Sequence, residues 1–260
     1  MNGSFGAPGG ISPVPQQRII AKMDEYMSRR DYAGAERHLL YWLREALLGR
    51  DRRGELMLRG ELIGHYRKTG EREKAFENAE AALRLIDELD FGGSISAGTT
   101  YVNAATALNA FGENERALAL FRKARSLYEE SAATRPALLG GLYNNMALAC
   151  ASLRRYDEAF ALYEKAMAAM AKEPSGALEQ AVTCLNMADL VHARDGMERG
   201  EREIFALVDR AAALLHDPAL PHDGYYAFVC EKCAPSFEYY GYFMEAEQLN
   251  QEAKRIYEGT

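Results

Sequence analysis

The sequence predicts an all-α solenoid of about six antiparallel helix pairs, and three observations support this fold class. Strand signals are nearly absent after residue 15, whereas Ala, Leu, Glu, Arg and Met, all strong helix formers, dominate the composition. A pattern of small and aromatic residues returns about every 42 residues, an interval typical of helical repeat proteins. The turn residues between the predicted helices return with the same period.

The second helix of each pair carries the clearest repeat. A small residue is followed by an aromatic or small residue four positions later and by a small residue seven positions later. Small residues let neighbouring helices approach closely, and stacked pairs then bury a continuous apolar core. Three sets follow one another at equal steps along the chain, and they are Ala75, Ala79 and Ala82; Ala117, Phe121 and Ala124; and Ala159, Tyr163 and Ala166. Weaker copies begin at Ala35 and Ala246.

The first helices repeat independently. An Asn-x-Ala signature recurs at Asn103, Asn145 and Asn186, at nearly the same step as the small-residue sets. Asn103 and Asn145 each precede the small-residue set of their own pair by the same distance along the chain, so two landmarks agree on one register. Gly and acidic residues suited to ending one helix and capping the next lie between them. The predicted pairs span about 16–49, 53–89, 97–131, 137–172, 177–216 and 223–258.

This pattern resembles the tetratricopeptide repeat. Ala147, Ala159, Tyr163 and Ala166 match its motif best. The 42-residue spacing is similar to the longer repeats of kinesin light chains and of bacterial peptide-sensing regulators. The resemblance covers nearly everything from about residue 16 onward and is weakest in pairs one, five and six. It implies a right-handed superhelical solenoid whose first helices line a concave binding face.

Composition and charge predict the domain organisation and exclude several classes of function. Residues 1–15 are rich in Gly, Pro and Ser and are expected to be a flexible leader before a single repeat domain over 16–260. A net charge of −7 argues against non-specific nucleic-acid binding and against a basic membrane-surface helix. Neither a signal-peptide pattern nor an apolar run long enough to span a membrane is seen. The four scattered cysteines are expected to be free thiols in the cytoplasm.

The asparagines are the best candidates for a binding site. Because Asn103, Asn145 and Asn186 share one repeat position, which we call the asparagine ladder, the resemblance implies that they line the groove. Each amide could pair with the backbone N–H and C=O of a bound peptide. The alternative is a hydrogen bond between helices that only fixes packing. The related candidates are Glu61 and Lys232 at the equivalent positions of pairs two and six, Asn144 beside the ladder, and Thr106 and Asp189 one turn further on.

No residue set amounts to a catalytic, metal or cofactor site. Cys230 and Cys233 form a single C-x-x-C pair, whereas a zinc site usually needs two such pairs or a nearby pair of histidines. The five histidines form no paired motif, and no Gly-rich phosphate loop follows a strand. The sequence therefore predicts a protein that is not an enzyme and that binds no cofactor.

The last pair is unusually aromatic. Tyr225, Tyr226 and Phe228 stand near the start of its first helix, and Pro235 lies inside that helix. These aromatic side chains would either pack inward or form an interface, including one with a second copy of the chain. The leading hypothesis is an interaction module that binds an extended peptide or partner helix in its groove. A peptide-sensing regulator acting on a separate effector and a homodimeric scaffold are the alternatives.

Overall fold

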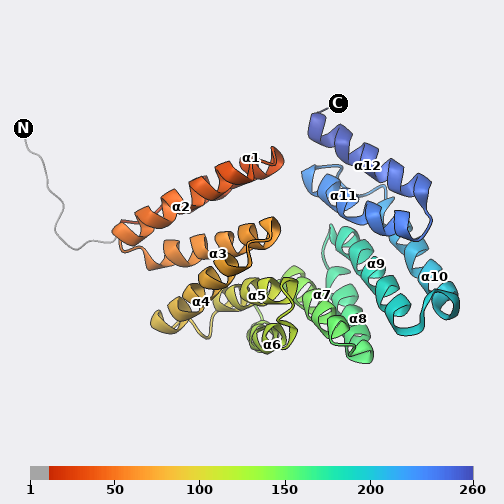
Figure 1. The fold of residues 1–260 in the computed structure, drawn as a ribbon, viewed down its shortest axis with the longest axis horizontal. Coiled ribbons are helices and arrows are strands. Elements are labelled where there is room, and N and C mark those ends of the chain that lie inside the picture. Colours follow the sequence, from red (N-terminus) through yellow and green to blue (C-terminus); the bar gives the residue numbers. More distant parts are fainter. Residues whose placement is uncertain (1–11, 260) are drawn as a thin grey trace, which may run out of the picture. The chain divides into compact units, whose positions relative to one another are not determined.

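The computed structural model describes residues 12–259, which form twelve α-helices and no strand (Figure 1). The helices follow one another with short connections, as the repeat predicts. Their bounds are α1 Gln16–Ser28, α2 Tyr32–Leu48, α3 Arg52–Thr69, α4 Arg72–Glu88, α5 Ile95–Ala110, α6 Asn114–Glu130, α7 Pro136–Ser152, α8 Tyr156–Met170, α9 Gly176–Asp195, α10 Met197–Leu215, α11 Gly224–Tyr239 and α12 Phe243–Glu258.

The predicted fold class and pairs are confirmed, with boundaries shifted by only a few residues. Partners pack against each other in the pairs α1–α2, α3–α4, α7–α8, α9–α10 and α11–α12. Neighbouring pairs meet in two ways. The second helix of one pair contacts the first helix of the next pair, for example α2 with α3 and α8 with α9. The first helices of neighbouring pairs also contact each other, for example α3 with α5 and α7 with α9.

The turns inside pairs two to four show why particular residues recur there. Gly70 and Gly112 adopt positive φ angles of 79° and 85°, which glycine reaches without steric cost. In pair four the corresponding turn uses Arg154 at φ 58°, a less common conformation for a residue with a side chain. The left-handed residue between the helices is thus a feature of the repeat, and glycine is its usual but not its obligatory occupant.

The described residues fall into two compact units, which we call the N-terminal unit (residues 12–127) and the C-terminal unit (residues 128–259). The division falls within α6. Each unit has its own cluster of buried apolar side chains, and no residue belongs to both clusters. The single repeat domain expected from the sequence stays a prediction.

The start of the chain differs from the expectation of a flexible leader through residue 15. Residues 1–11 lie outside the described part, but residues 12–15 are held against the connection between α2 and α3. The Ser12 N–H donates to the Gly49 carbonyl oxygen at 2.9 Å, and the Val14 N–H donates to Asp51 Oδ2 at 2.9 Å. Val14 is buried in the N-terminal core. Composition alone does not reveal this, because one apolar residue suffices to anchor a short segment.

Pair five, where the repeat is weakest, keeps the register of the others. Gly200 follows Asn186 at the same offset that separates the ladder asparagine from the first small residue of the second helix in pairs three and four. It is buried against Val191, and a Cβ built on it would come within 2.9 Å of that side chain. The buried stripe of α10 then continues through Ile204, Val208, Ala211 and Leu215. A glycine replaces the alanine, which explains why the sequence pattern is hard to see there.

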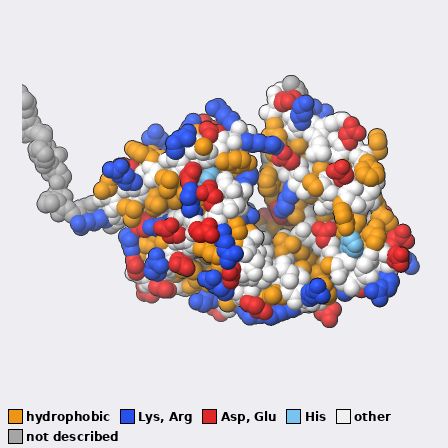
Figure 2. All heavy atoms as spheres, viewed as in Figure 1, with side chains coloured by type: hydrophobic (Ala, Val, Ile, Leu, Met, Phe, Trp, Pro, Cys, Tyr) orange, Lys and Arg blue, Asp and Glu red, His pale blue; other side chains and the backbone are white. Residues whose placement is uncertain are grey.

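The C-terminal unit contains all four cysteines of the chain. All four, Cys150, Cys184, Cys230 and Cys233, are buried and outside any disulfide. Across residues 12–259, none of the helices is both long enough and apolar enough to cross a membrane. On the face shown in Figure 2, acidic and basic side chains are interspersed within each unit rather than gathered into a patch of one sign.

Candidate functional site

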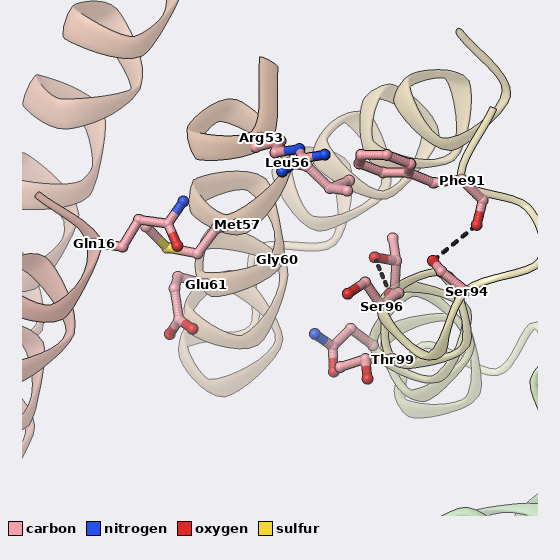
Figure 3. A pocket seen from close by; sticks show the side chains of 12 residues that line it. Gln16, Arg53, Leu56, Met57, Gly60, Glu61, Phe91, Ser94, Ser96 and Thr99 are labelled. Carbon is pink, nitrogen blue, oxygen red and sulfur yellow. Dashed lines mark hydrogen bonds between the residues drawn. The ribbon is translucent and has the colours of Figure 1, made fainter. Parts of the chain in front are cut away.

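A cleft of about 590 Å³ opens on the N-terminal unit beside α3 and α5. Its volume falls in the range typical of binding pockets. Figure 3 shows side chains of α3, among them Glu61, and side chains of α5, among them Ser96 and Thr99, around the space. The lining residues are Gln16 from α1; Arg53, Leu56, Met57, Gly60 and Glu61 from α3; Phe91 and Ser94 from the α4–α5 connection; and Ser96, Thr99, Thr100 and Asn103 from α5.

Asn103 reaches this cleft with its amide unengaged. The side chain is half-buried, and nothing else in the described part of the chain hydrogen-bonds to it. Gly60 lies opposite on α3, and a Cβ built on it would stand 3.5 Å from Asn103 Nδ2. Because glycine has no side chain, the amide stays open to the cleft. It can therefore donate to and accept from a ligand backbone at once.

Glu61, which follows Gly60 on α3 and is half-buried, lines the same cleft and has no cation beside its carboxylate. Burial raises its pKa above the ordinary value, and the negative charge of Asp24 on α1 raises it further. No Lys, Arg or His of residues 12–259 forms an ion pair with it. A positively charged ligand group would relieve this electrostatic cost. The guanidinium of Arg53 lies instead over the Phe91 ring, 5.2 Å from its centroid.

In the C-terminal unit one member of the asparagine ladder has a structural partner. Asn186 Nδ2 donates to Asn144 Oδ1 at 3.2 Å, and the Thr183 hydroxyl donates to the same oxygen at 3.3 Å. These bonds join α9 to α7, so the packing alternative applies to Asn186 and Asn144. Asn145 is half-buried and has no hydrogen-bond partner among the described residues.

The remaining candidates, Thr106, Lys232 and Asp189, differ in their exposure and in their hydrogen bonds. The Thr106 hydroxyl donates to the Val102 carbonyl within its own helix, at 2.8 Å. Lys232 is exposed on α11. Asp189 is exposed as well, yet the surrounding protein raises its pKa by desolvation, while a hydrogen bond from the Tyr240 hydroxyl at 2.7 Å acts in the opposite direction. A carboxylate that is accessible and yet poorly solvated is expected in a concave surface.

The aromatic candidates of pair six differ in their exposure to solvent. Tyr225 and Phe228 are each 45% exposed, and their rings stack with centroids 6.3 Å apart. The Tyr225 hydroxyl also donates to Glu179 of α9. Tyr226, in contrast, is 2% exposed and its ring stacks on His222 at 4.2 Å. Helical spacing turns Tyr226 into the C-terminal core, so the inward-packing alternative describes this residue.

Several cleft residues escaped prediction from the sequence. Gln16, Arg53 and Phe91 come from helix ends and a connection, where the repeat pattern carries no information. Gly60 offered the one available signal, because a glycine inside a helix costs roughly 1 kcal/mol relative to alanine and often marks a close approach.

Comparison with known proteins places this geometry in a familiar fold. Residues 55–130 match the model of the tetratricopeptide repeat family. The crystal structure of BtubC (BKLC) from P. vanneervenii is similar, with a TM-score of 0.55 and 20% identity over 89% of this chain and 91% of that one. The crystal structure of the TPR-like repeats of a putative kinesin light chain from P. anserina is also similar. It has a TM-score of 0.52 and 18% sequence identity, over 76% of this chain and 92% of that one. No curated protein sequence matches the chain.

Proposed function

We propose that this tetratricopeptide-like repeat protein is a non-catalytic interaction module that binds an extended peptide. Repeats of this family generally mediate protein–protein contacts through the surfaces that their first helices line. The observation that carries the proposal is the cleft beside α3 and α5, which is lined by the free amide of Asn103 on α5 and the unpaired carboxylate of Glu61 on α3. The buried cysteines, which form no disulfide, support the reducing cytoplasm as its compartment.

The chemistry of the cleft defines what kind of peptide it would take. Asn103 would hold the peptide backbone without reading its sequence. Glu61 would pair with a Lys or Arg side chain or with an N-terminal amine, because its carboxylate has no cation of its own. A charge-assisted hydrogen bond of this kind contributes about 1.5–3 kcal/mol. The preferred ligand is therefore an extended peptide with one basic group.

A phage-displayed library of unstructured peptides, selected on the full chain, tests this function. We expect the selected sequences to share a basic residue. Synthetic versions should bind Glu61→Gln and Asn103→Ala about ten- to a hundredfold more weakly than wild type, as measured by fluorescence polarisation. Glu80→Gln, which removes the same charge from the exposed face of α4, is the matched control and should bind normally.

Two outcomes would refute the role of the cleft. One is a library that yields no enriched sequence. The other is a set of selected peptides that bind Glu61→Gln and Asn103→Ala as tightly as the wild-type chain, while circular dichroism shows that both variants are folded.

A second role is favoured by the exposed Tyr225 and Phe228 rings on α11. Two stacked aromatic side chains on one surface are typical anchors of protein interfaces. We propose that they can join two copies of the chain. Light scattering over a range of concentrations should detect a dimer that Phe228→Ala weakens, and a monomer at every concentration would contradict this role.

A further inference from the structure

A second cluster of reactive groups lies in the N-terminal unit among α2, α3 and α4. Glu36 belongs to α2 and His65 to α3, and Glu71 is the residue directly before α4. Each of the three offers one possible ligand atom, and these atoms all lie within 4.8 Å of one another. None of the three residues lines the cleft described above. The cluster therefore needs an explanation of its own.

His65 is the member that packing does not explain. The side chain is only 5% exposed, and its Nδ1 atom is buried without a hydrogen-bond partner. Leaving a buried polar atom unpaired costs about 1–3 kcal/mol, so such atoms are rare in folded proteins. The neighbouring Tyr66 ring meets the imidazole edge-on at 5.3 Å but supplies no hydrogen bond to that nitrogen.

The two carboxylates already act together on a cation. Lys74 Nζ lies 2.9 Å from Glu36 Oε1 and 2.6 Å from Glu71 Oε2. The Tyr66 hydroxyl donates to Glu36 at 2.9 Å, and the Thr69 hydroxyl donates to Glu71 at 3.1 Å. These donors orient the carboxylates. The Lys74 side chain is itself 48% exposed, so its ammonium can move into solvent without crossing the core.

We propose that Glu36, His65 and Glu71 form a Zn²⁺ site in which the metal takes the place of the Lys74 ammonium. One imidazole and two carboxylates suit Zn²⁺, whereas Mg²⁺ and Ca²⁺ prefer oxygen ligands alone. Three protein ligands leave the fourth tetrahedral position to water. Ligand atoms around zinc are roughly 3.3–3.5 Å apart at the usual bond lengths, so the present spacing requires only side-chain rotations.

Such a site would connect α2 to α3 and to the turn before α4, and so would join two repeat pairs. Zinc bound only to the folded protein stabilises it by mass action. The site could not be predicted from a sequence motif, because its ligands are unevenly spaced over two repeat pairs and match no known metal-ligand spacing. The expected consequence is an N-terminal unit whose stability depends on zinc.

Isothermal titration of Zn²⁺ into the full, untagged, chelator-treated chain tests the proposal. We expect one equivalent to bind to wild type. Lys74→Gln should bind Zn²⁺ at least threefold more tightly, because the competing positive charge is gone, whereas Glu71→Gln should bind at least tenfold more weakly. An ion-pair network without a metal role would not gain Zn²⁺ affinity when its lysine is removed.

Glu113→Gln is the matched control. Glu113 holds the same turn position one repeat later and pairs with Arg72 and Arg116, and it belongs to no group of potential metal ligands in the described residues. Its substitution should leave Zn²⁺ binding unchanged. The proposal is overturned if neither wild type nor Lys74→Gln binds one equivalent, or if Glu113→Gln weakens binding as much as Glu71→Gln does. Substituted Co²⁺ that shows a thiolate charge-transfer band would also overturn it, because the metal would then lie at the cysteines.

Discussion

The N-terminal and C-terminal units place the same residue type at the same repeat position, yet they use it differently. Asn103 faces Gly60 across α5 and α3, and its amide is free. Asn186 faces Asn144 across α9 and α7, and the two amides are hydrogen-bonded. Gly60 and Asn144 both immediately precede the ladder position of the earlier pair. A single residue on the neighbouring helix therefore decides whether the ladder asparagine can serve a ligand or only supports packing.

The units also differ in how they are held together. Among the described helix caps, α2, α3 and α5 of the N-terminal unit are capped by a side chain that accepts a hydrogen bond from a backbone N–H, whereas in the C-terminal unit only α11 is.

The two units also contain different probes, because the C-terminal unit holds the four cysteines. The only tryptophan, Trp42, packs half-buried against the N-terminal core. Trp42 fluorescence and thiol reactivity can therefore report on the two units separately.

The largest expected effect comes from emptying one core. Phe237 is fully buried in the C-terminal unit, and Phe237→Ala should lower the free energy of unfolding by about 3–5 kcal/mol. Denaturant unfolding followed by thiol reactivity should show the full loss. Trp42 fluorescence should shift much less, because the two apolar clusters share no residue. Equal shifts of both probes would instead support the single repeat domain expected from the sequence.

Loss of a helix cap should weaken the N-terminal unit. Asp51 Oδ1 accepts from the Gly54 N–H at 2.9 Å and caps α3, while Oδ2 holds Val14. Asp51→Ala should therefore cost about 1–3 kcal/mol, measured by Trp42 fluorescence in denaturant. Asp31→Ala is the matched control, because Asp31 caps α2 through Gly34 alone and is exposed. A cost for Asp31→Ala as large as that for Asp51→Ala would contradict the second role of Asp51.

Alkaline pH should weaken the C-terminal unit through its thiols. Burial raises the pKa of Cys230 to about 11 and that of Cys233 to about 12, from 9.0. Because the folded state holds these protons more tightly, their stabilisation is complete below about pH 9 and is lost as pH rises toward 11 and 12. Between about pH 9 and 10 the loss should be about 1 kcal/mol per thiol. Unfolding of the Cys230→Ala/Cys233→Ala double variant should show a correspondingly flatter pH dependence, and an unchanged slope would contradict this account.

The smallest effects should come from exchanging the residues that face the ladder. Asn144→Gly removes the acceptor of Asn186 and adds a helical glycine, so it should cost about 1–2 kcal/mol. Gly60→Asn should add up to about 1 kcal/mol of stability and abolish peptide binding, because the new side chain would occupy the Asn103 amide. Thermal unfolding and fluorescence polarisation measure both effects. Unimpaired peptide binding by Gly60→Asn would separate Asn103 from the ligand.

The sequence alone determined the helix pairs and the register of pairs two to four, whereas the register of pair five came from the structure. The period of small residues is local information, because close helix packing requires small side chains at fixed positions along each helix. The same periodicity identified Asn103 and Glu61 by position. It could not place Tyr226, whose direction depends on how α11 sits on its neighbours, or residues 12–15, which are anchored by Asp51 from a distant position.

Only the tertiary structure decided which of these positions are available for chemistry. Whether an asparagine amide is free depends on the residue that a neighbouring helix brings to it, as Gly60 and Asn144 show. Likewise, Glu36 meets His65 and Glu71 only because α2 packs against α3. Hydrogen bonding and burial are properties of pairs of residues remote in sequence, so a repeat pattern can indicate the candidate positions, and the packing of adjacent helices then sets their partners.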